Sequence, residues 1–373
     1  MRCFIFGIEW FEFLNLYRKL TDLEVVPPQD CMTQTVQLPD WPFAYGGPSG
    51  QGKIRSYPDD FIVHEQLGFE PSGSGEHVFL YIEKTGENTE YVARALARFA
   101  EVRQRDIGYA GLKDRHARTR QWFSVWLPGK SDPNWQEFET DDIKVLSAER
   151  HNKKLKRGVL VGNDFNLTVR EWNGDKDQTI AIFEAIKEQG LPNYFGEQRF
   201  GFQGQNINQA LALFQGAKVK RQQRSLYLSA ARSFLFNEVL AERVKQKNWN
   251  QYLAGDALMF DRSRSYFKTE TMDQELRARV NDYNVHPSGM LYGFGQLDVK
   301  DEAHSIEQAV CKKYPKLVEG LIKAKVELAR RPLRIMVENL NWQFAEPNCL
   351  TLAFSLPAGS YATTLLREII TQD

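Results

Sequence analysis

The chain has 373 residues, of which 42% are hydrophobic and 26% are charged, and its 48 basic side chains balance its 48 acidic ones. These values are typical of folded globular proteins, and the length suits two domains or one domain with a large insertion. No run of about 18 apolar residues is present, so we expect no membrane-spanning helix. The four cysteines lie far apart without a Cys-x-x-Cys pair, so we expect no metal site, no disulfides and a cytoplasmic location.

Residues 1–40 are predicted to be a poorly ordered N-terminal extension. Glu9 and Glu12 interrupt the apolar run at the start of the chain, which argues against a secretory signal peptide. Met32 begins the polar stretch that leads to the first strand-like segment. One hypothesis is that Met32 is the native start, and the alternative is a natural extension.

Apolar runs separated by turn residues predict several strands in the first half of the chain. The expected strands are 53–55, 61–63, 78–82, 107–110, 121–127 and 165–169. Asn88 or Thr89 can cap a helix, because apolar side chains at 92, 95, 96 and 99 follow with helical spacing. This mixture predicts an α+β domain.

The pattern becomes more helical after about residue 189, and strand signals become sparse. Helices are expected over 228–247, 273–280 and 306–331, strands over 333–337 and 350–356, and a last helix over 363–370. The simplest topology is an α+β domain interrupted by a helical insertion.

Basic residues gather in three stretches of the chain. The first runs from Arg150 to Arg157, the second lies within the acid-free stretch 198–237, and the third covers 103–130 and contains Asp106 and Asp114. A single cluster is most simply a solvated face. Three clusters interleaved with aromatic residues favour a nucleic-acid surface, through phosphate contacts and base stacking.

Asp114 is the most informative single residue. It lies in a polar connection between two apolar strands, with cations on both sides. A carboxylate in this setting is either a nucleophile or a turn residue paired with a neighbouring arginine, and the local context leaves both interpretations open.

Three long segments, in the same order, resemble the TruD family of tRNA pseudouridine synthases. They are residues 109–122, which contain Gly-Leu-Lys-Asp-Arg-His, residues 192–201, which read Pro-Asn-Tyr-Phe-Gly-Glu-Gln-Arg-Phe-Gly, and residues 356–363, which read Leu-Pro-Ala-Gly-Ser-Tyr-Ala-Thr. The resemblance covers about residues 40–373. It implies a catalytic domain with a mixed, largely antiparallel sheet over 41–189 and 335–373, interrupted by an inserted α/β domain over 190–334.

The resemblance also implies an activity, the conversion of uridine to pseudouridine in tRNA, typically at position 13, without a cofactor or metal. Asp114 matches the nucleophile, while Phe61, Asn163 and Tyr361 match positions that contact the substrate. Arg55 falls at a basic position near the nucleophile. Tyr361 stands where family members carry Phe, so its hydroxyl group needs a partner or water.

The implied partner is tRNA, and no protein partner is inferred. The extruded uridine would be flanked by phosphates held by basic side chains. The predicted RNA-binding residues are Arg150, Lys153, Lys154, Lys156, Arg157, Arg199, Lys218, Lys220, Arg221 and Arg224.

Two questions stay open at this point. The nucleophile can attack carbon 6 of the base or assist departure of the base from the ribose. A non-catalytic RNA-binding or tRNA-folding protein is the alternative function, since it needs the basic surface but not Asp114. A methyltransferase is disfavoured, because no glycine-rich cofactor fingerprint is present.

Overall fold

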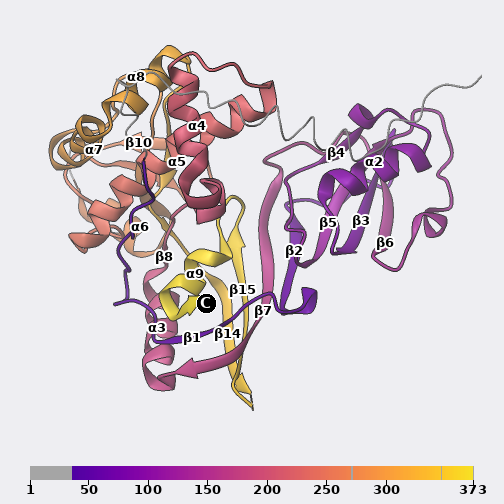
Figure 1. The fold of residues 1–373 in the computed structure, drawn as a ribbon, viewed down its shortest axis with the longest axis horizontal. Helices are drawn as coiled ribbons and strands as arrows, with labels where there is room; N and C mark the ends of the chain where they lie inside the picture. Colours follow the sequence, from indigo (N-terminus) through magenta and orange to yellow (C-terminus); the bar gives the residue numbers. More distant parts are fainter. Residues whose placement is uncertain (1–35, 270–271, 346, 373) are drawn as a thin grey trace, which may run out of the picture. The chain divides into compact units, whose positions relative to one another are not determined.

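The computed structural model describes residues 36–269, 272–345 and 347–372. Met32 and most of the predicted extension therefore lie outside the described residues. Leu38–Asp373 forms one compact unit, and the description below concerns this unit (Figure 1). No helix in the described part is long and apolar enough to cross a membrane.

Strands dominate the unit before α3 and again after α8, and most of the helices lie between them. The strands are β1 (Gly50–Lys53), β2 (Phe61–Leu67), β3 (His77–Thr85), β4 (Ile107–Tyr109), β5 (Arg118–Trp126), β6 (Ile143–His151), β7 (Leu160–Gly174), β8 (Leu191–Pro192), β9 (Ala257–Phe260), β10 (Tyr266–Lys268), β11 (Val285–Leu291), β12 (Ala329–Pro332), β13 (Arg334–Ile335), β14 (Glu338–Ala345), β15 (Cys349–Pro357) and β16 (Ile370–Gln372). The α-helices are α2 (Thr89–Phe99), α3 (Lys176–Gln189), α4 (Gln205–Phe214), α5 (Arg221–Lys245), α6 (Gln274–Asn281), α7 (Asp301–Lys313), α8 (Pro315–Lys323) and α9 (Ala362–Ile369).

A large mixed sheet is the centre of the fold. Its strand order is β14-β15-β7-β2-β5-β3-β6, with β1, β4 and β16 paired at its margins. The pairs are antiparallel except for β2 with β5 and β1 with β16. Figure 1 shows the long strand β7 between β15 and β2. The predicted α+β class with a mixed, largely antiparallel sheet is confirmed.

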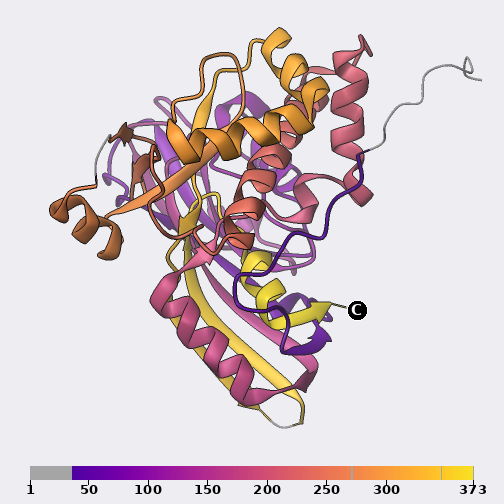
Figure 2. The ribbon, with the colours of Figure 1, turned by 90° about the vertical axis from the view of Figure 1, so that its left-hand side faces the viewer.

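Helices bury the apolar faces of this sheet in two clusters. The inward side chains of β2, β7 and β15 pack with α3 and α9, whose Phe183 and Leu365 are fully buried, and Figure 2 shows α3 lying along the strands. Helix α2 covers β3 and β5 through Val92 and Leu96. The helical spacing that predicted α2 is the spacing of these buried positions.

The segment between β8 and β13 contains α4 to α8 and a second sheet of order β10-β9-β11-β12. Strands β8 and β13 pair with each other, with Leu191 opposite Ile335. Gly190 precedes β8 at φ +83°, where a Cβ atom would lie 2.4 Å from the Ile335 carbonyl oxygen. The division into domains at 190 and 334 stays a prediction, since 38–373 forms one compact unit.

Two predicted elements are wrong. The strand expected over 53–55 is displaced, because β1 ends at Lys53 and Arg55 has a left-handed backbone at φ +59°. The helix expected over 306–331 is two helices, α7 and α8, followed by strand β12. Pro315 is the cause: it has no amide hydrogen and its ring clashes with a preceding carbonyl, so it breaks a helix interior but is accepted at the first position of α8.

Candidate active site

Asp114 lies on the loop that connects β4 to β5, and this loop is held by buried polar groups. The Gln121 side chain donates to the Gly111 carbonyl at 2.7 Å and accepts from the Thr89 hydroxyl at 2.9 Å. The same hydroxyl oxygen accepts from the Lys113 amide at 3.0 Å. Since Thr89 begins α2 and Gln121 lies in β5, the loop is fixed to both elements.

The Asp114 carboxylate faces a guanidinium group. Its Oδ2 lies 3.0 Å from Nη2 of Arg55, and its Oδ1 accepts from the His116 amide at 3.0 Å. The Asp114 side chain is 34% exposed, so the carboxylate is oriented by two partners and still open to a substrate. Both interpretations of Asp114, paired residue and nucleophile, are compatible with this geometry.

Arg55 also covers Phe61. Its guanidinium carbon lies 4.2 Å from the centroid of the Phe61 ring, and Phe165 packs edge-on against the same ring at 6.4 Å. Phe61 is only 4% exposed. The structure therefore brings Asp114, Arg55 and Phe61 together, with Phe61 beneath the arginine and not open to solvent.

Asn163 belongs to the same site through Lys113. The Lys113 ammonium donates to Asn163 Oδ1 at 2.5 Å and lies 3.0 Å from Glu65 Oε1. The Glu65 side chain is completely buried, and its other oxygen accepts from the Trp122 amide at 3.0 Å. Burial raises the pKa of the Glu65 carboxyl, and Lys113 opposes this shift.

Lys84 of β3 also contacts the β4–β5 loop, through the backbone of Asp114. Its fully buried ammonium donates to the backbone carbonyls of Glu87, at 2.6 Å, and Asp114, at 3.3 Å. Burial lowers the pKa of Lys84 to about 8, although the Asp114 carboxylate acts in the opposite direction.

Neither Glu65 nor Lys84 belongs to a predicted site, and Lys113 is predicted only as a member of a basic cluster. The sequence does contain a pattern that marks Glu65 and Lys84. Glu65 continues the alternation of the buried Phe61 and Val63, and Lys84 continues that of the apolar residues of β3. A charged residue at a position that the strand period assigns to the core needs a buried partner.

Tyr361 belongs to a second group of side chains, at the start of α9. Its hydroxyl group accepts hydrogen bonds from Nε and Nη2 of Arg199, at 3.1 and 2.6 Å, and its ring packs edge-on against Phe195. Arg199 is thus the partner that the tyrosine hydroxyl requires. Among the described residues, no hydrogen bond, ion pair or ring contact joins Tyr361 to Asp114.

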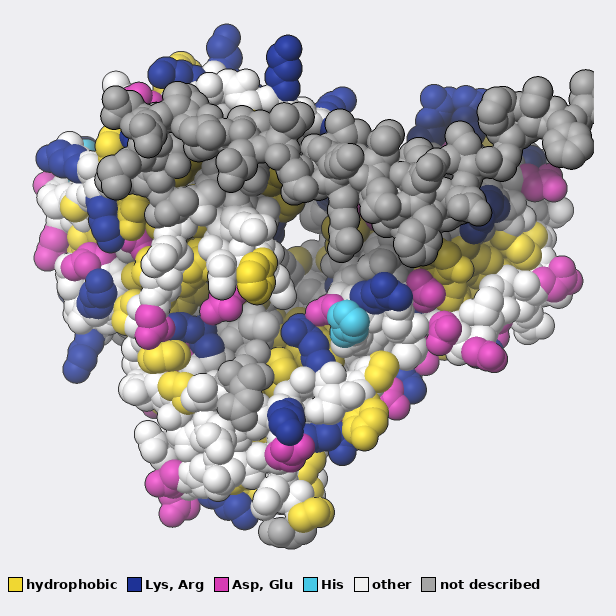
Figure 3. Space-filling view, viewed as in Figure 1, with side chains coloured by type: hydrophobic (Ala, Val, Ile, Leu, Met, Phe, Trp, Pro, Cys, Tyr) yellow, Lys and Arg dark blue, Asp and Glu magenta, His cyan; other side chains and the backbone are white. Residues whose placement is uncertain are grey.

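The predicted RNA-binding residues differ in how they are held. Arg150 pairs with Asp132 and donates to three backbone carbonyls, while Lys154 donates to the Arg105 carbonyl at 2.5 Å. The residues exposed to solvent are Lys153, Lys156, Arg157, Lys218, Lys220 and Arg221, and Arg224 is half-buried. Figure 3 shows Lys and Arg side chains interspersed with Asp and Glu on the visible face. The RNA-binding assignments stay predictions.

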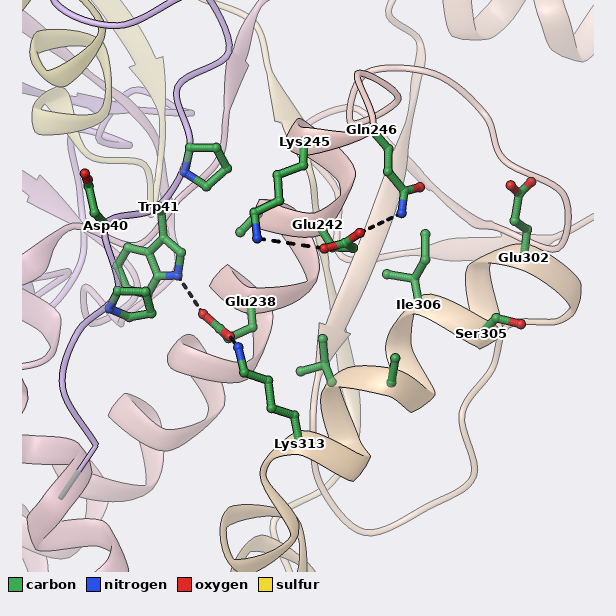
Figure 4. Close-up of a pocket in the computed structure, with 15 residues that line it drawn as sticks. Asp40, Trp41, Glu238, Glu242, Lys245, Gln246, Glu302, Ser305, Ile306 and Lys313 are labelled. Atoms are coloured by element: carbon green, nitrogen blue, oxygen red, sulfur yellow. Dashed lines mark hydrogen bonds and ion pairs between the residues drawn. The ribbon is translucent and has the colours of Figure 1, made fainter. Parts of the chain in front are cut away.

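A cavity of about 470 Å³ lies elsewhere, between residues 39–42, α5 and α7 (Figure 4). None of the predicted catalytic or substrate-binding residues lines it. Its Glu238 accepts hydrogen bonds from the Trp41 indole, the Lys313 ammonium and the Tyr314 hydroxyl, so this carboxylate serves packing. No cluster of His, Cys, Asp or Glu suited to a metal ion occurs in the part of the chain that the structure describes.

Comparison with known proteins identifies the family. The family model described as tRNA pseudouridine synthase D (TruD) matches residues 42–216 and 203–369. The tRNA pseudouridine synthase D of Methylococcus capsulatus is 49% identical over 336 residues, which cover 90% of this chain and 95% of the relative. That of Nitrosococcus oceani is 48% identical and covers 88% of this chain and 93% of its own. The chain therefore belongs to the TruD family, and the resemblance found in the sequence is confirmed.

A solved structure supports the fold. The crystal structure of a Methanosarcina mazei protein, provisionally named tRNA pseudouridine synthase D, superposes with a TM-score of 0.69 at 21% identity. It covers 88% of this chain and 95% of that protein. The family membership favours an enzyme over the alternative of a non-catalytic RNA-binding or tRNA-folding protein.

Proposed function

We propose that this protein isomerises uridine to pseudouridine in tRNA, with Asp114 as the nucleophile. The observation that carries the proposal is the partly exposed Asp114 carboxylate, held by Arg55 on a loop fixed by α2 and β5. The family's sequence motif surrounds this residue, and relatives of nearly the same length are named tRNA pseudouridine synthase D.

The reaction needs one bond to break and another to form within a single nucleoside. The bond between N1 of uracil and C1′ of ribose breaks, the base turns, and C5 bonds to C1′, while C5 loses its proton and N1 gains one. The Asp114 carboxylate can support this sequence by attack at C6 of the base or by assisting departure of the base from C1′. Both routes return the carboxylate unchanged, so the reaction is a net isomerisation.

The target uridine must leave its stack to reach Asp114, at a cost of a few kcal/mol. We assign Asn163 and Tyr361 as substrate contacts, with Tyr361 supplying an aromatic face. Phe61 is the remaining assigned aromatic contact, and stacking on it requires Arg55 to move from its ring. Position 13 of tRNA is the proposed target, and the cytoplasm is the proposed site of action.

The test is pseudouridine formation in a tRNA transcript, mapped by chemistry that marks pseudouridine. Asp114→Asn keeps the size of the side chain but removes the anionic nucleophile, so we expect no product and nearly unchanged tRNA affinity. Asp59→Asn is a matched control, because Asp59 is exposed and also pairs with an arginine, Arg118. Product from Asp114→Asn at the wild-type rate would overturn the proposal.

A further inference from the structure

The Asn163 side chain is held in one orientation by its lysine partner. A lysine ammonium carries three donors and no acceptor, so the amide atom 2.5 Å from Lys113 Nζ must be the oxygen. The amide nitrogen therefore points away from Lys113. It has no hydrogen-bond partner among the described residues and is not among their fully buried unpaired atoms, so part of it is exposed although Asn163 as a whole is only 9% exposed.

Glu65 makes this arrangement rigid. Glu65 and Asn163 are directly opposite each other in the β2–β7 register, and Lys113 bridges them from the neighbouring loop. Removing the charge of either ion would leave the other buried and unpaired, which is costly. An amide flip would place an NH2 group against the ammonium. The ion pair thus fixes which end of the amide a substrate meets.

We propose that Lys113 and Glu65 are positioning residues that lock Asn163 as a hydrogen-bond donor to a carbonyl oxygen of the flipped uracil. This proposal rests on the proposed function. Uracil offers carbonyl oxygens O2 and O4, whereas cytosine carries an NH2 donor at position 4. If the fixed donor faces O4, it rejects cytosine, because the donor would then meet the NH2 group of cytosine. If the fixed donor faces O2, its hydrogen bond weakens when O2 is replaced by a weaker acceptor.

The experiment measures equilibrium binding of three tRNA transcripts in the non-reacting Asp114→Asn background. The transcripts carry uridine, cytidine or 2-thiouridine at the target position and are otherwise identical. Contacts far from the base cancel in the ratio of their dissociation constants. If the donor faces O4, we expect the cytidine transcript to bind about tenfold more weakly than the uridine transcript, which is the effect of one unsatisfied polar contact. If the donor faces O2, we expect the same loss for the 2-thiouridine transcript.

Lys113→Met should lower this ratio several-fold, because the amide is then free to turn and offer its oxygen. Asn163→Asp replaces the donor by an acceptor that Lys113 still holds. If the donor faces O4, this variant should bind the cytidine transcript as tightly as the uridine transcript or more tightly, and if the donor faces O2, it should lose the preference for uridine over 2-thiouridine. Glu307→Gln is the matched control for loss of a buried ion pair, since Glu307 pairs with the buried Arg330 elsewhere in the chain. It should leave the ratio unchanged.

An unchanged ratio in folded Lys113→Met, or equal weakening of all three transcripts, would overturn the proposal. If Lys113→Met does not fold, an unchanged preference for uridine in Asn163→Asp would overturn it. Failure of the proposed function is seen separately, as absence of pseudouridine with the wild-type enzyme. If pseudouridine forms but the ratio of dissociation constants is unchanged in the variants, the positioning role is refuted and the proposed function stands.

Discussion

The buried Lys84 predicts a specific dependence of stability on pH. Its ammonium is fully buried, its hydrogen-bond acceptors among the described residues are two backbone carbonyls, and its pKa is lowered from 10.5 to about 8. Between these two pH values the unfolded chain binds a proton at Lys84 that the folded chain has released. The free energy of unfolding therefore rises with pH across that window. Below pH 8 the folded state bears the full free-energy cost of burying the charged ammonium.

The magnitude follows from the size of the shift. One pKa unit corresponds to about 1.4 kcal/mol, so the charged form of Lys84 costs the folded state about 3 kcal/mol relative to the neutral form. Between pH 7 and pH 9.5 about 2 kcal/mol of this penalty is relieved. The wild type should therefore gain about 2 kcal/mol relative to Lys84→Met over this range, because all other titrating groups are common to both proteins.

Urea denaturation of both proteins at several pH values measures this difference. Lys187→Met is the control, because Lys187 is exposed on α3, and its difference from the wild type should stay flat. A wild-type advantage over Lys84→Met that is constant, or that falls as pH rises, would refute the reasoning.

Three further predictions follow from the geometry. Tyr361→Phe should lower the free energy of unfolding by about 1 kcal/mol, because the hydroxyl accepts two hydrogen bonds from a charged partner; equal urea midpoints would contradict this. Replacing Lys153, Lys156 and Arg157 together by Ala should weaken tRNA binding and reduce the slope of log affinity against log salt by up to about 0.7–0.9 per lost contact, whereas an unchanged slope would mean a solvated surface. Gly190→Ala should destabilise the fold by more than about 1 kcal/mol in thermal or urea unfolding, since its positive φ and the 2.4 Å contact both oppose a Cβ atom, and a neutral effect would contradict that.

The sequence was sufficient for the elements with strong periodicity. The alternation of Phe165, Leu167 and Val169 belongs to β7, and the helical spacing after Thr89 belongs to α2. The short strands of the second sheet had no comparable signal. β11 contains Pro287 and Gly289 and is buried along most of its length, so it shows neither alternation nor a typical strand composition.

The site residues within one sequence motif could be predicted, whereas those brought together from distant strands could not. The motif around Asp114 placed the nucleophile on its loop. Arg55 approaches it from outside that motif, with a left-handed backbone at φ +59° that the sequence does not reveal. The link from Glu65 through Lys113 to Asn163 depends on the β2–β7 register, which is set by packing over the whole sheet and not by local sequence.

The short β8–β13 pair determines how freely the chain between these strands can vary in length. Because its two ends meet in one ladder, with Leu191 opposite Ile335, residues 193–333 close a loop whose ends are held by the same hydrogen bonds whatever lies between them. The entropy cost of closing such a loop grows only with the logarithm of its length, by about 0.6 kcal/mol for each doubling in a flexible chain. Residues can thus be inserted in the exposed loops of this segment while Asp114, Lys113 and Asn163 keep their places on the large sheet, provided that Arg199, which holds Tyr361, is retained.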